Sequence, residues 1–168
     1  MSSATVAQLK GYLSHPNGTV RDNAQRLLVE RITTNDEALA EWDKSNVDTR
    51  AKGLALLHAL WVYESVGNIP HQIILKGLAD ENTDVINSAL ELARLSDSPA
   101  TSALLKYEPT TKTIHSYIYA LGGVATIESH KRAVKMINKF QGEAKQLEAV
   151  YISGLGAKVH QVQAFGTA

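Results

Sequence analysis

The sequence has no cysteine among its 168 residues. This absence excludes disulfide bonds, zinc sites built from thiolates and covalent attachment of a c-type haem. It leaves the cellular compartment open, because many proteins outside the cytoplasm also lack cysteine. The sequence therefore limits the chemistry of the chain more than its location.

The chain also has no excess of charge of either sign, since 17 Lys and Arg balance 17 Asp and Glu. A protein that binds nucleic acid by neutralising phosphates needs a basic surplus, so we expect no nucleic-acid partner, although a local basic strip is compatible with the total. A composition of 44% hydrophobic residues is enough to bury one continuous core. The sequence predicts a single domain over residues 1–168.

Long apolar runs are missing as well. The longest, residues 53–63, is about eleven residues and contains His58, whereas a bilayer-spanning helix needs roughly twenty. The first nine residues have neither the basic start nor the apolar stretch of a secretory signal. We expect no insertion into a membrane, and we find no export signal in this sequence.

One helical phrase recurs along the chain. Residues 20–28 read VRDNAQRLL, with degenerate relatives at 51–61, 85–93, 114–121 and 147–155. When one residue of each copy is set in register, the copies stand about 35, 30, 29 and 31 residues apart, which is the spacing of helical-hairpin repeats. The residues in register are Ala24, Ala59, Ala89, Ile118 and Ala149.

Apolar residues follow a helical period almost everywhere, and no stretch shows sustained strand alternation. We place the first helix at residues 4–14 and begin the second after Thr19, its expected N-cap. The further predicted helices cover 36–43, 48–66, 70–78, 84–95, 100–107, 113–121, 127–140 and 143–155. The predicted fold is therefore all-α, an α-α superhelix of about five antiparallel helix pairs.

Capping and turn residues set the expected helix ends. Asp48 is the expected N-cap of the helix at 48–66, and Gly67 is its C-terminal glycine. Gly122-Gly123 is expected to end the helix at 113–121. Residues 156–168 are small and polar, which predicts a frayed end or a truncated next helix.

The first two repeats resemble a known family. LSHPNGTVRDNAQRLLVER at residues 13–31, followed by LHALW at 57–61, is similar to the HEAT-repeat module of large bacterial membrane-bound dehydrogenases. In that family the module lies between a dehydrogenase-like propeller and a haem-binding cytochrome c domain. The resemblance is strongest over residues 9–95, and beyond them it is generic to HEAT-like repeats.

This resemblance implies a scaffold and no redox chemistry. The chain has no Cys-x-x-Cys-His haem motif and is too short to hold a propeller. The resemblance implies a domain excised from a longer protein, periplasmic or extracytoplasmic, whose partners are neighbouring domains of the same polypeptide or a partner subunit. No cofactor is implied for this chain.

Four residues are candidates for an interaction or structural motif: Arg21, Arg26, His58 and Trp61. His58 lies in the most apolar helix, where it is either a ligand or a core histidine with a hydrogen-bond partner; the second reading is favoured because no histidine lies four residues away. Arg21 and Arg26 are candidates to grip a carboxylate or phosphate; the favoured alternative is that Arg21 caps a helix or bridges to the neighbouring repeat. Arg26 and Glu30 have the i, i+4 spacing of a helical ion pair.

Other signals in the sequence are weaker. Tyr117 and Tyr119 are two apart and cannot share a helical face, so we expect one in the core and the other exposed. The basic residues from His130 to Lys139 form a short strip that is typical of a solvated helix face. A glycine pair at 154 and 156 lacks the strand and lysine of a phosphate loop. No metal-ligand spacing and no catalytic constellation stand out.

Three classes of function remain open. The leading one is a non-catalytic scaffold that spaces or docks the propeller and cytochrome c domains of a larger redox protein. The second is an enzyme on the same scaffold, of the HEAT-like DNA glycosylase or bilin lyase type; neutral charge and scattered aromatics count against a glycosylase. The third is a stand-alone peptide or small-ligand binder, which requires a deep pocket between repeats.

Overall fold

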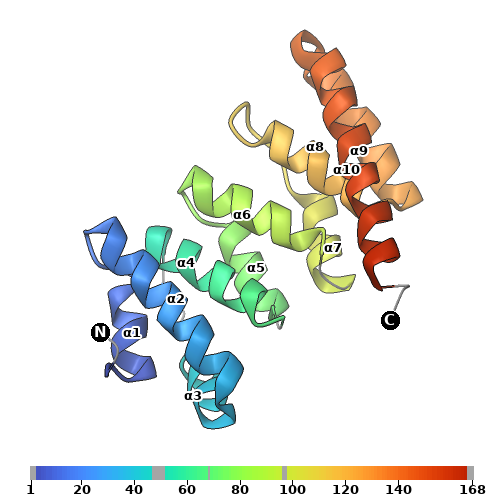
Figure 1. Ribbon diagram of the computed structural model, residues 1–168. Helices are drawn as coiled ribbons and strands as arrows, with labels where there is room; N and C mark the ends of the chain where they lie inside the picture. The colour runs from blue at the N-terminus through green and yellow to red at the C-terminus, as the bar shows by residue number, and fades with distance from the viewer. Residues whose placement is uncertain (1–2, 47–51, 68, 96–97, 166–168) are drawn as a thin grey trace.

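The protein is all-helical, as the sequence predicts. A computed structural model describes residues 3–46, 52–67, 69–95 and 98–165, without the side chains of 43–46, 98–99 and 158–165. In this part of the chain every regular element is a helix (Figure 1). The elements are α1 (Val6–Tyr12), α2 (Gly18–Thr34), α3 (Asp36–Asn46), α4 (Gly53–Ser65), α5 (His71–Leu78), α6 (Thr83–Ala93), α7 (Ser98–Lys106), α8 (Ile114–Val124), α9 (Ile127–Lys139), the 3-10 turn Gln141–Glu143 and α10 (Ala144–Phe165).

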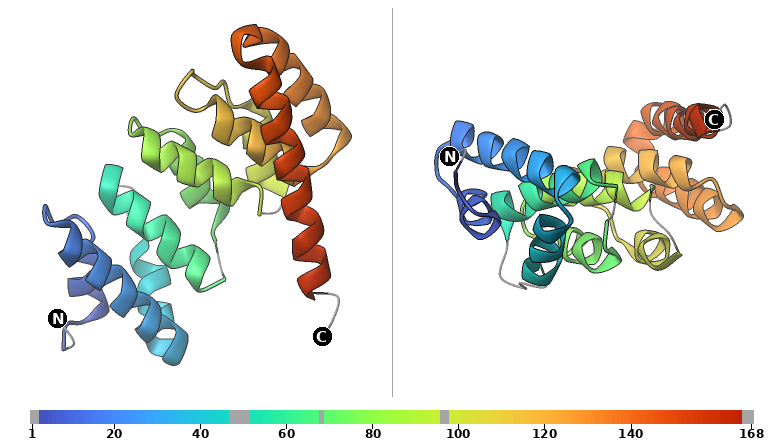
Figure 2. Two further views of the ribbon diagram at one scale, coloured as in Figure 1. Left: turned by 45° about the horizontal axis from the view of Figure 1, so that its top comes forward. Right: turned by 60° about the horizontal axis from the view of Figure 1, so that its bottom comes forward.

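The helices lie in two layers. Each even-numbered helix packs on the next, from α2 through α4, α6 and α8 to α10, and these five form one row. The odd-numbered helices lie on the other side, where α1 contacts α3, α5 contacts α7, and α7 contacts α9. The right-hand view of Figure 2 shows both layers; the even-numbered row is curved, and its two ends rise above its middle.

Side-chain caps begin several helices where the sequence changes from turn to apolar period. Thr5 and Gln8 form a capping box at α1, and Thr126 and Ser129 form one at α9. At α2 the expected cap is wrong by two residues, because the Asn17 side chain accepts from the Thr19 backbone N–H at 2.9 Å. Thr19 is already inside the helix, since Gly18 before it also adopts helical geometry.

The long helix of the second pair begins later than predicted. The expected cap Asp48 lies outside the described residues, and α4 starts at Gly53 after Lys52. Its end agrees with the prediction: Gly67, with φ of 72°, stands just past the C-cap Val66. Glycine suits that place because side chains disfavour the left-handed region.

The core runs between the two layers and contains four of the five residues that the repeat alignment places in register. Ala24, Ala59, Ala89 and Ile118 are all buried there. Ala149 is exposed, so the fifth copy was set in the wrong register; α10 instead buries Leu147 and Gly154. The largest core side chain is Trp42 of α3, whose ring lies 5.2 Å from that of Tyr63 in α4.

The expected helix break at Gly122-Gly123 is wrong. Helix α8 continues to Val124 and ends at Ala125, which has φ of 52°. The glycines serve a close helix crossing: a Cβ on Gly122 would lie 2.5 Å from the Tyr151 carbonyl oxygen of α10. From the other side, a Cβ on Gly154 would lie 2.3 Å from the Tyr119 carbonyl oxygen. The two backbones pack where side chains would hold them apart.

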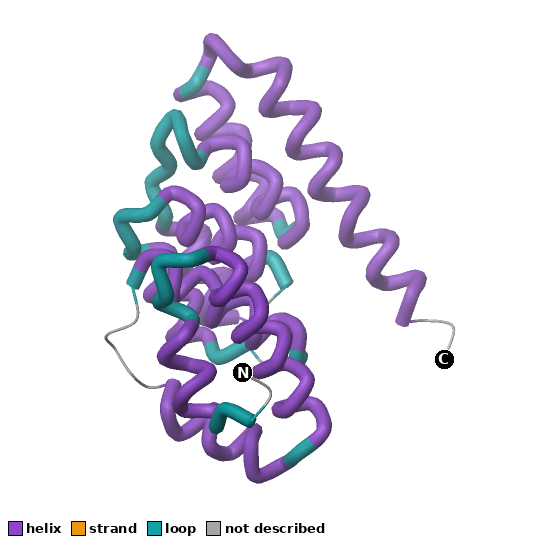
Figure 3. Tube along the Cα trace, turned by 60° about the vertical axis from the view of Figure 1, so that its left-hand side comes forward, coloured by secondary structure: helices purple, strands orange, loops and turns teal. Residues whose placement is uncertain are grey.

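For residues 156–168 the sequence predicts a frayed end or a truncated next helix, and the structure instead continues α10 without a break to Phe165. Its first half is anchored on α8 and α9, and a helix that is already nucleated extends at little cost. Figure 3 shows the C-terminal half of α10 running away from the other helices. Small residues and weak periodicity therefore predicted the wrong structure at this end.

Candidate functional site

A partly buried polar cluster joins the first two even-numbered helices. Arg21 of α2 donates from Nε to His58 Nε2 of α4 at 3.2 Å, and His58 Nδ1 lies 2.7 Å from the side-chain oxygen of Gln25. The same guanidinium donates to the carbonyl oxygens of His15 and Pro16 in the turn before α2, at 2.7 and 3.0 Å. Arg21 thus holds both the turn before α2 and helix α4.

These bonds fix the state of His58. Because Nε2 accepts from a guanidinium, the proton of the neutral ring is on Nδ1, from which it is donated to Gln25. Burial lowers the pKa of His58, the Arg21 charge lowers it further, and Asp22 works in the opposite direction. His58 is a buried histidine with its hydrogen bonds made, which is the structural reading that the sequence favours.

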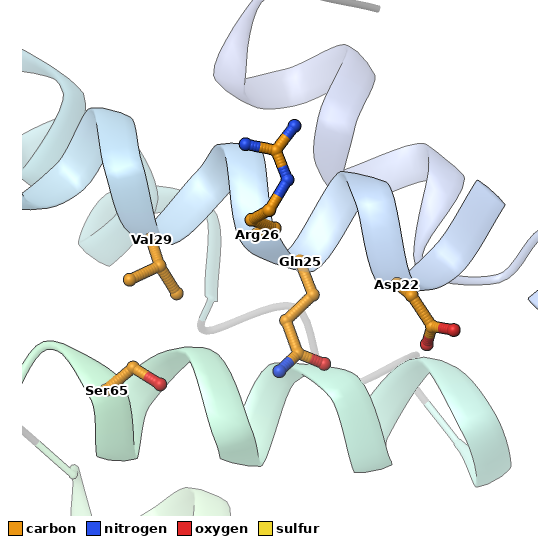
Figure 4. A pocket seen from close by; sticks show the side chains of 5 residues that line it. All are labelled: Asp22, Gln25, Arg26, Val29 and Ser65. Carbon is orange, nitrogen blue, oxygen red and sulfur yellow. The ribbon is translucent and has the colours of Figure 1, made fainter. Parts of the chain in front are cut away.

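A hollow of ≈ 320 Å³ opens beside this cluster, between α2 and α4. Asp22, Gln25, Arg26 and Val29 line it from α2, and Ser65 lines it from α4 (Figure 4). Gln25 reaches toward α4, whereas the Arg26 guanidinium points away from it. The hollow combines a carboxylate, an amide, a hydroxyl and an aliphatic side chain, which suits hydrogen bonding to a polypeptide more than enclosing an apolar ligand.

Of the two remaining candidates, Arg26 lines this hollow and Trp61 lies one turn along α4 from its lining residue Ser65. Arg26 is exposed and forms a 3.3 Å ion pair with Glu30, as its spacing predicts. Trp61 is half-buried and packs against the core. It stands one helical turn before Ser65, so both residues belong to the same side of α4. The structure therefore gathers Arg21, Arg26, His58 and Trp61 around one junction of α2 and α4.

Arginines also tie later helices together. Arg94, the C-cap of α6, donates to Glu91 at 2.9 Å and lies over the Tyr119 ring of α8, 5.2 Å from its centroid. Its side chain occupies the space beside Gly123, where a Cβ would lie 2.8 Å from Arg94 Cδ. Burial opposes the charge of Arg94, but its bonds to Glu91 leave its pKa raised.

The basic strip of α9 includes one residue that is not simply solvated. Arg132 donates to the Tyr117 hydroxyl at 2.9 Å, to the Tyr107 carbonyl at 2.7 Å and to Glu108 at 2.6 Å. The bond from Arg132 lowers the pKa of Glu108, and burial raises the pKa of Tyr117. The sequence missed this connection because the partners lie 15 to 25 residues away; an arginine on an otherwise amphipathic helix is too common to reveal it.

The structure also shows the outcome of two weaker sequence signals. Tyr117 is fully buried and Tyr119 is half-buried, so the pair divides between core and surface as expected, although less sharply. Gly154 lies inside α10 against α8, which agrees with the sequence reading that this glycine pair lacks the features of a phosphate loop. In the part of the chain that the structure describes, no group of three His, Cys, Asp or Glu residues is placed to hold a metal ion.

Comparisons with known proteins give no relative: no family model, no curated protein and no solved structure matches the chain. Among the helices within the described ranges, none is both long and apolar enough to cross a bilayer. Function must therefore be argued from the geometry of the molecule itself.

Proposed function

We propose that this chain is a HEAT-like helical solenoid that acts as a non-catalytic docking scaffold. The support is the order of the helix contacts. Among the described even-numbered helices, each contacts only the one before and the one after it in the row, which is how stacked repeats pack. Such a row presents a long surface made of one helix per repeat. The partner in this proposal is a polypeptide that lies along the even-numbered face.

The junction of α2 and α4 is the part of this face best suited to hold a partner. Asp22 and Arg26 offer charges of both signs, and Gln25 and Ser65 offer hydrogen-bonding groups. Trp61, one turn from Ser65, adds the kind of aromatic side chain that dominates interface energies. A segment with a basic and an acidic residue flanking an apolar one would match this surface.

The observation that carries the proposal is this open, mixed surface supported by the bonded trio of Arg21, His58 and Gln25. The trio joins α2 to α4 and uses the side-chain oxygen of Gln25, a residue that also lines the hollow. Because this junction already holds the two helices, little backbone ordering remains to be met on binding. A partner would exchange with the bond of Arg26 to Glu30 and the bond of the Ser65 hydroxyl to the Trp61 carbonyl.

The resemblance of residues 9–95 gives the proposal a specific form. In that form the chain spaces or docks a dehydrogenase-like propeller and a cytochrome c domain of a periplasmic redox protein. The partners are then domains of the same polypeptide, and the scaffold itself carries no cofactor. A DNA glycosylase is less well supported, because the hollow is lined by one acidic and one basic residue and has no basic excess.

A peptide library displayed on phage tests the docking proposal without a known partner. Peptides selected on the full chain should lose binding to Arg26→Glu, whose side chain is 64% exposed and can change without disturbing the core. The matched control is Lys106→Glu on α7, an exposed residue of the opposite layer. Peptides that bind both variants equally would show that the α2/α4 junction is not the docking surface.

The redox form has its own test. A cytochrome c domain and a propeller domain from a protein of the resembled family are each mixed with the immobilised full chain. If the immobilised chain retains one of these domains, and the Arg26→Glu variant does not, the result supports the redox form of the proposal. If neither domain is retained while library peptides still are, the redox assignment is rejected and the docking function stands.

A further inference from the structure

The first three helices join the rest of the described chain at one helix. In the described ranges α1, α2 and α3 pack on one another, and of the later helices only α4 packs against them. The contact consists of α2 along α4 and of the Trp42 ring of α3, which lies 5.2 Å from the Tyr63 ring of α4. Figure 1 shows α4 between this group and α6. The junction of α2 and α4 is therefore where α1–α3 can move as a unit against the later helices.

His58 lies in this junction and uses both ring nitrogens to bond to α2. Nε2 accepts from the Arg21 Nε–H at 3.2 Å, and Nδ1 lies 2.7 Å from the side-chain oxygen of Gln25. Nδ1 carries a proton in the neutral and in the charged ring, so the bond to Gln25 exists in both states. Nε2 accepts from Arg21 only while it carries no proton. One of the two bonds that tie this ring to α2 thus depends on the charge of the ring.

Among the described residues, the charges that act on this ring are both on α2. Burial lowers the pKa of His58 most, the Arg21 charge lowers it further, and Asp22 raises it. Asp22 lies on the side of α2 that faces α4 (Figure 4). The helices packed on α4 are α2, α5 and α6, and α6 lies on the side away from α2. Other ionisable residues of these elements play no part in the shift: His15, Arg26, Glu30 and Arg31 on α2 and the turn before it, Lys52 and Glu64 at the ends of α4, His71 and Lys76 on α5, and Asp84, Glu91 and Arg94 on α6.

We propose that His58 is a pH-sensitive latch between α2 and α4, closed by the bond from Arg21 and opened when Nε2 takes up a proton from the solvent. A protonated Nε2 is a donor, and it would face the Arg21 N–H across 3.2 Å, so that two cations meet where a hydrogen bond had been. Arg21 stays with α2, because its Nη1 also donates to the carbonyl oxygens of His15 and Pro16 in the turn before that helix. The repulsion therefore acts between α2 and α4 and loosens the packing of α1–α3 on α4.

The open state also changes the hollow beside the junction. The new Nε2–H needs an acceptor, and the carboxylate of Asp22, which lines the hollow, is the charge on α2 that attracts it. A bond to His58 withdraws this carboxylate from a partner. Because the pKa of His58 lies below 6.5, the latch is closed at neutral pH and opens in acid. The loss of docking in acid rests on the proposed function, whereas the latch itself does not.

Distances between pairs of spin labels, measured by pulsed electron resonance, test the latch. The chain has no cysteine, so each label can be placed at a single introduced one. Asn23→Cys on α2 and Asp84→Cys on α6 are exposed and report across the junction. Their distance distribution should broaden and shift to longer distances between about one pH unit above and about two units below the ordinary histidine pKa of 6.5. Asp84→Cys with Lys131→Cys on α9 is the control pair, which should not change.

A histidine variant separates the latch from general effects of acid. In His58→Gln the amide oxygen can accept from Arg21 at every pH, so the junction pair should give the same distribution at both ends of the titration. The matched control is His71→Gln, at an exposed histidine of α5, which should open in acid like the unchanged chain. Circular dichroism of both variants should show unchanged helix content. Equal opening of His58→Gln and His71→Gln would overturn the latch.

Nuclear magnetic resonance of the full chain follows the two partners directly. The ring nitrogens of His58 and the Nε–H of Arg21 should change with one common midpoint, and Asp22→Asn should move that midpoint to lower pH, because the charge that favours the proton is removed. A ring that titrates while the Arg21 signal stays constant would overturn the latch. If the latch opens but library peptides bind equally at both pH values, its link to docking is rejected. If no peptide binds at any pH, the docking function fails and the latch stands.

Discussion

The close crossing of α8 and α10 predicts that one glycine-to-alanine substitution has opposite effects at two sites of the same helix. In Gly154→Ala the new Cβ would lie 2.3 Å from the Tyr119 carbonyl oxygen, 3.1 Å from Gly122 Cα and 3.2 Å from the backbone nitrogen of Gly123. All three are backbone atoms of α8. No rotamer change can relieve the overlap, so the helices must separate.

The magnitude follows from two opposing effects. Alanine stabilises a helix interior by about 1 kcal/mol relative to glycine. Overpacking a close contact costs about 1–3 kcal/mol, and backbone overlap on three sides puts this site at the upper end. Gly154→Ala should therefore lower the free energy of unfolding by about 2 kcal/mol, the difference between about 3 and about 1.

Gly156→Ala is the matched control, two residues further along α10. Nothing lies within 4 Å of the position its Cβ would take, so only the gain in helix propensity remains. We expect it to raise the free energy of unfolding by up to about 1 kcal/mol. Urea unfolding followed by far-ultraviolet circular dichroism measures both. If Gly154→Ala is as stable as Gly156→Ala, the close packing of α8 on α10 is refuted.

Two further predictions concern buried side chains. The pKa of His58 is lowered in the folded chain, so the unfolded chain binds a proton at this histidine more readily. The stability that neutral His58 contributes is therefore complete above the ordinary pKa of 6.5 and is lost as the pH falls below it. One histidine can change the free energy of unfolding by at most about 1.4 kcal/mol per pH unit, and His58→Gln should remove this part of its pH dependence. If urea unfolding of the variant shows the same pH dependence as the unchanged chain, this role of His58 is disproved. Arg132→Ala should cost about 1–3 kcal/mol of unfolding free energy, because the Tyr117 hydroxyl and the Tyr107 carbonyl lose their donor. Exposed Lys131→Ala should change it by less than about 0.5 kcal/mol; equal effects of the two would contradict the buried role of Arg132.

The helical class and most helix positions follow from sequence alone because their causes are local. Apolar period, turn residues and the glycine after α4 act within a few residues of where they stand. The cap of α2 was misplaced by two residues, since Asn17 and Thr19 are both good capping residues and only the backbone geometry decides between them. Local signals define an element better than its exact first residue.

What the sequence could not predict depends on contacts between distant segments. Gly122 and Gly123 are helix breakers by propensity, and they are helical here because α10 and Arg94 need the space that side chains would fill. The exposure of Ala149 shows the same limit, because the rotation of α10 is set by its packing on α8. The grouping of Arg21, Arg26, His58 and Trp61 at one junction likewise required the spatial pairing of α2 with α4.

The docking claim is tested most directly by the affinity of one peptide selected on the full chain, measured by calorimetry against three proteins. We expect Arg26→Glu to weaken binding at least about tenfold, which is about 1.4 kcal/mol, and Lys106→Glu to bind like the unchanged chain. Equal affinity for all three proteins would contradict the claim that the face formed by α2 and α4 holds the partner.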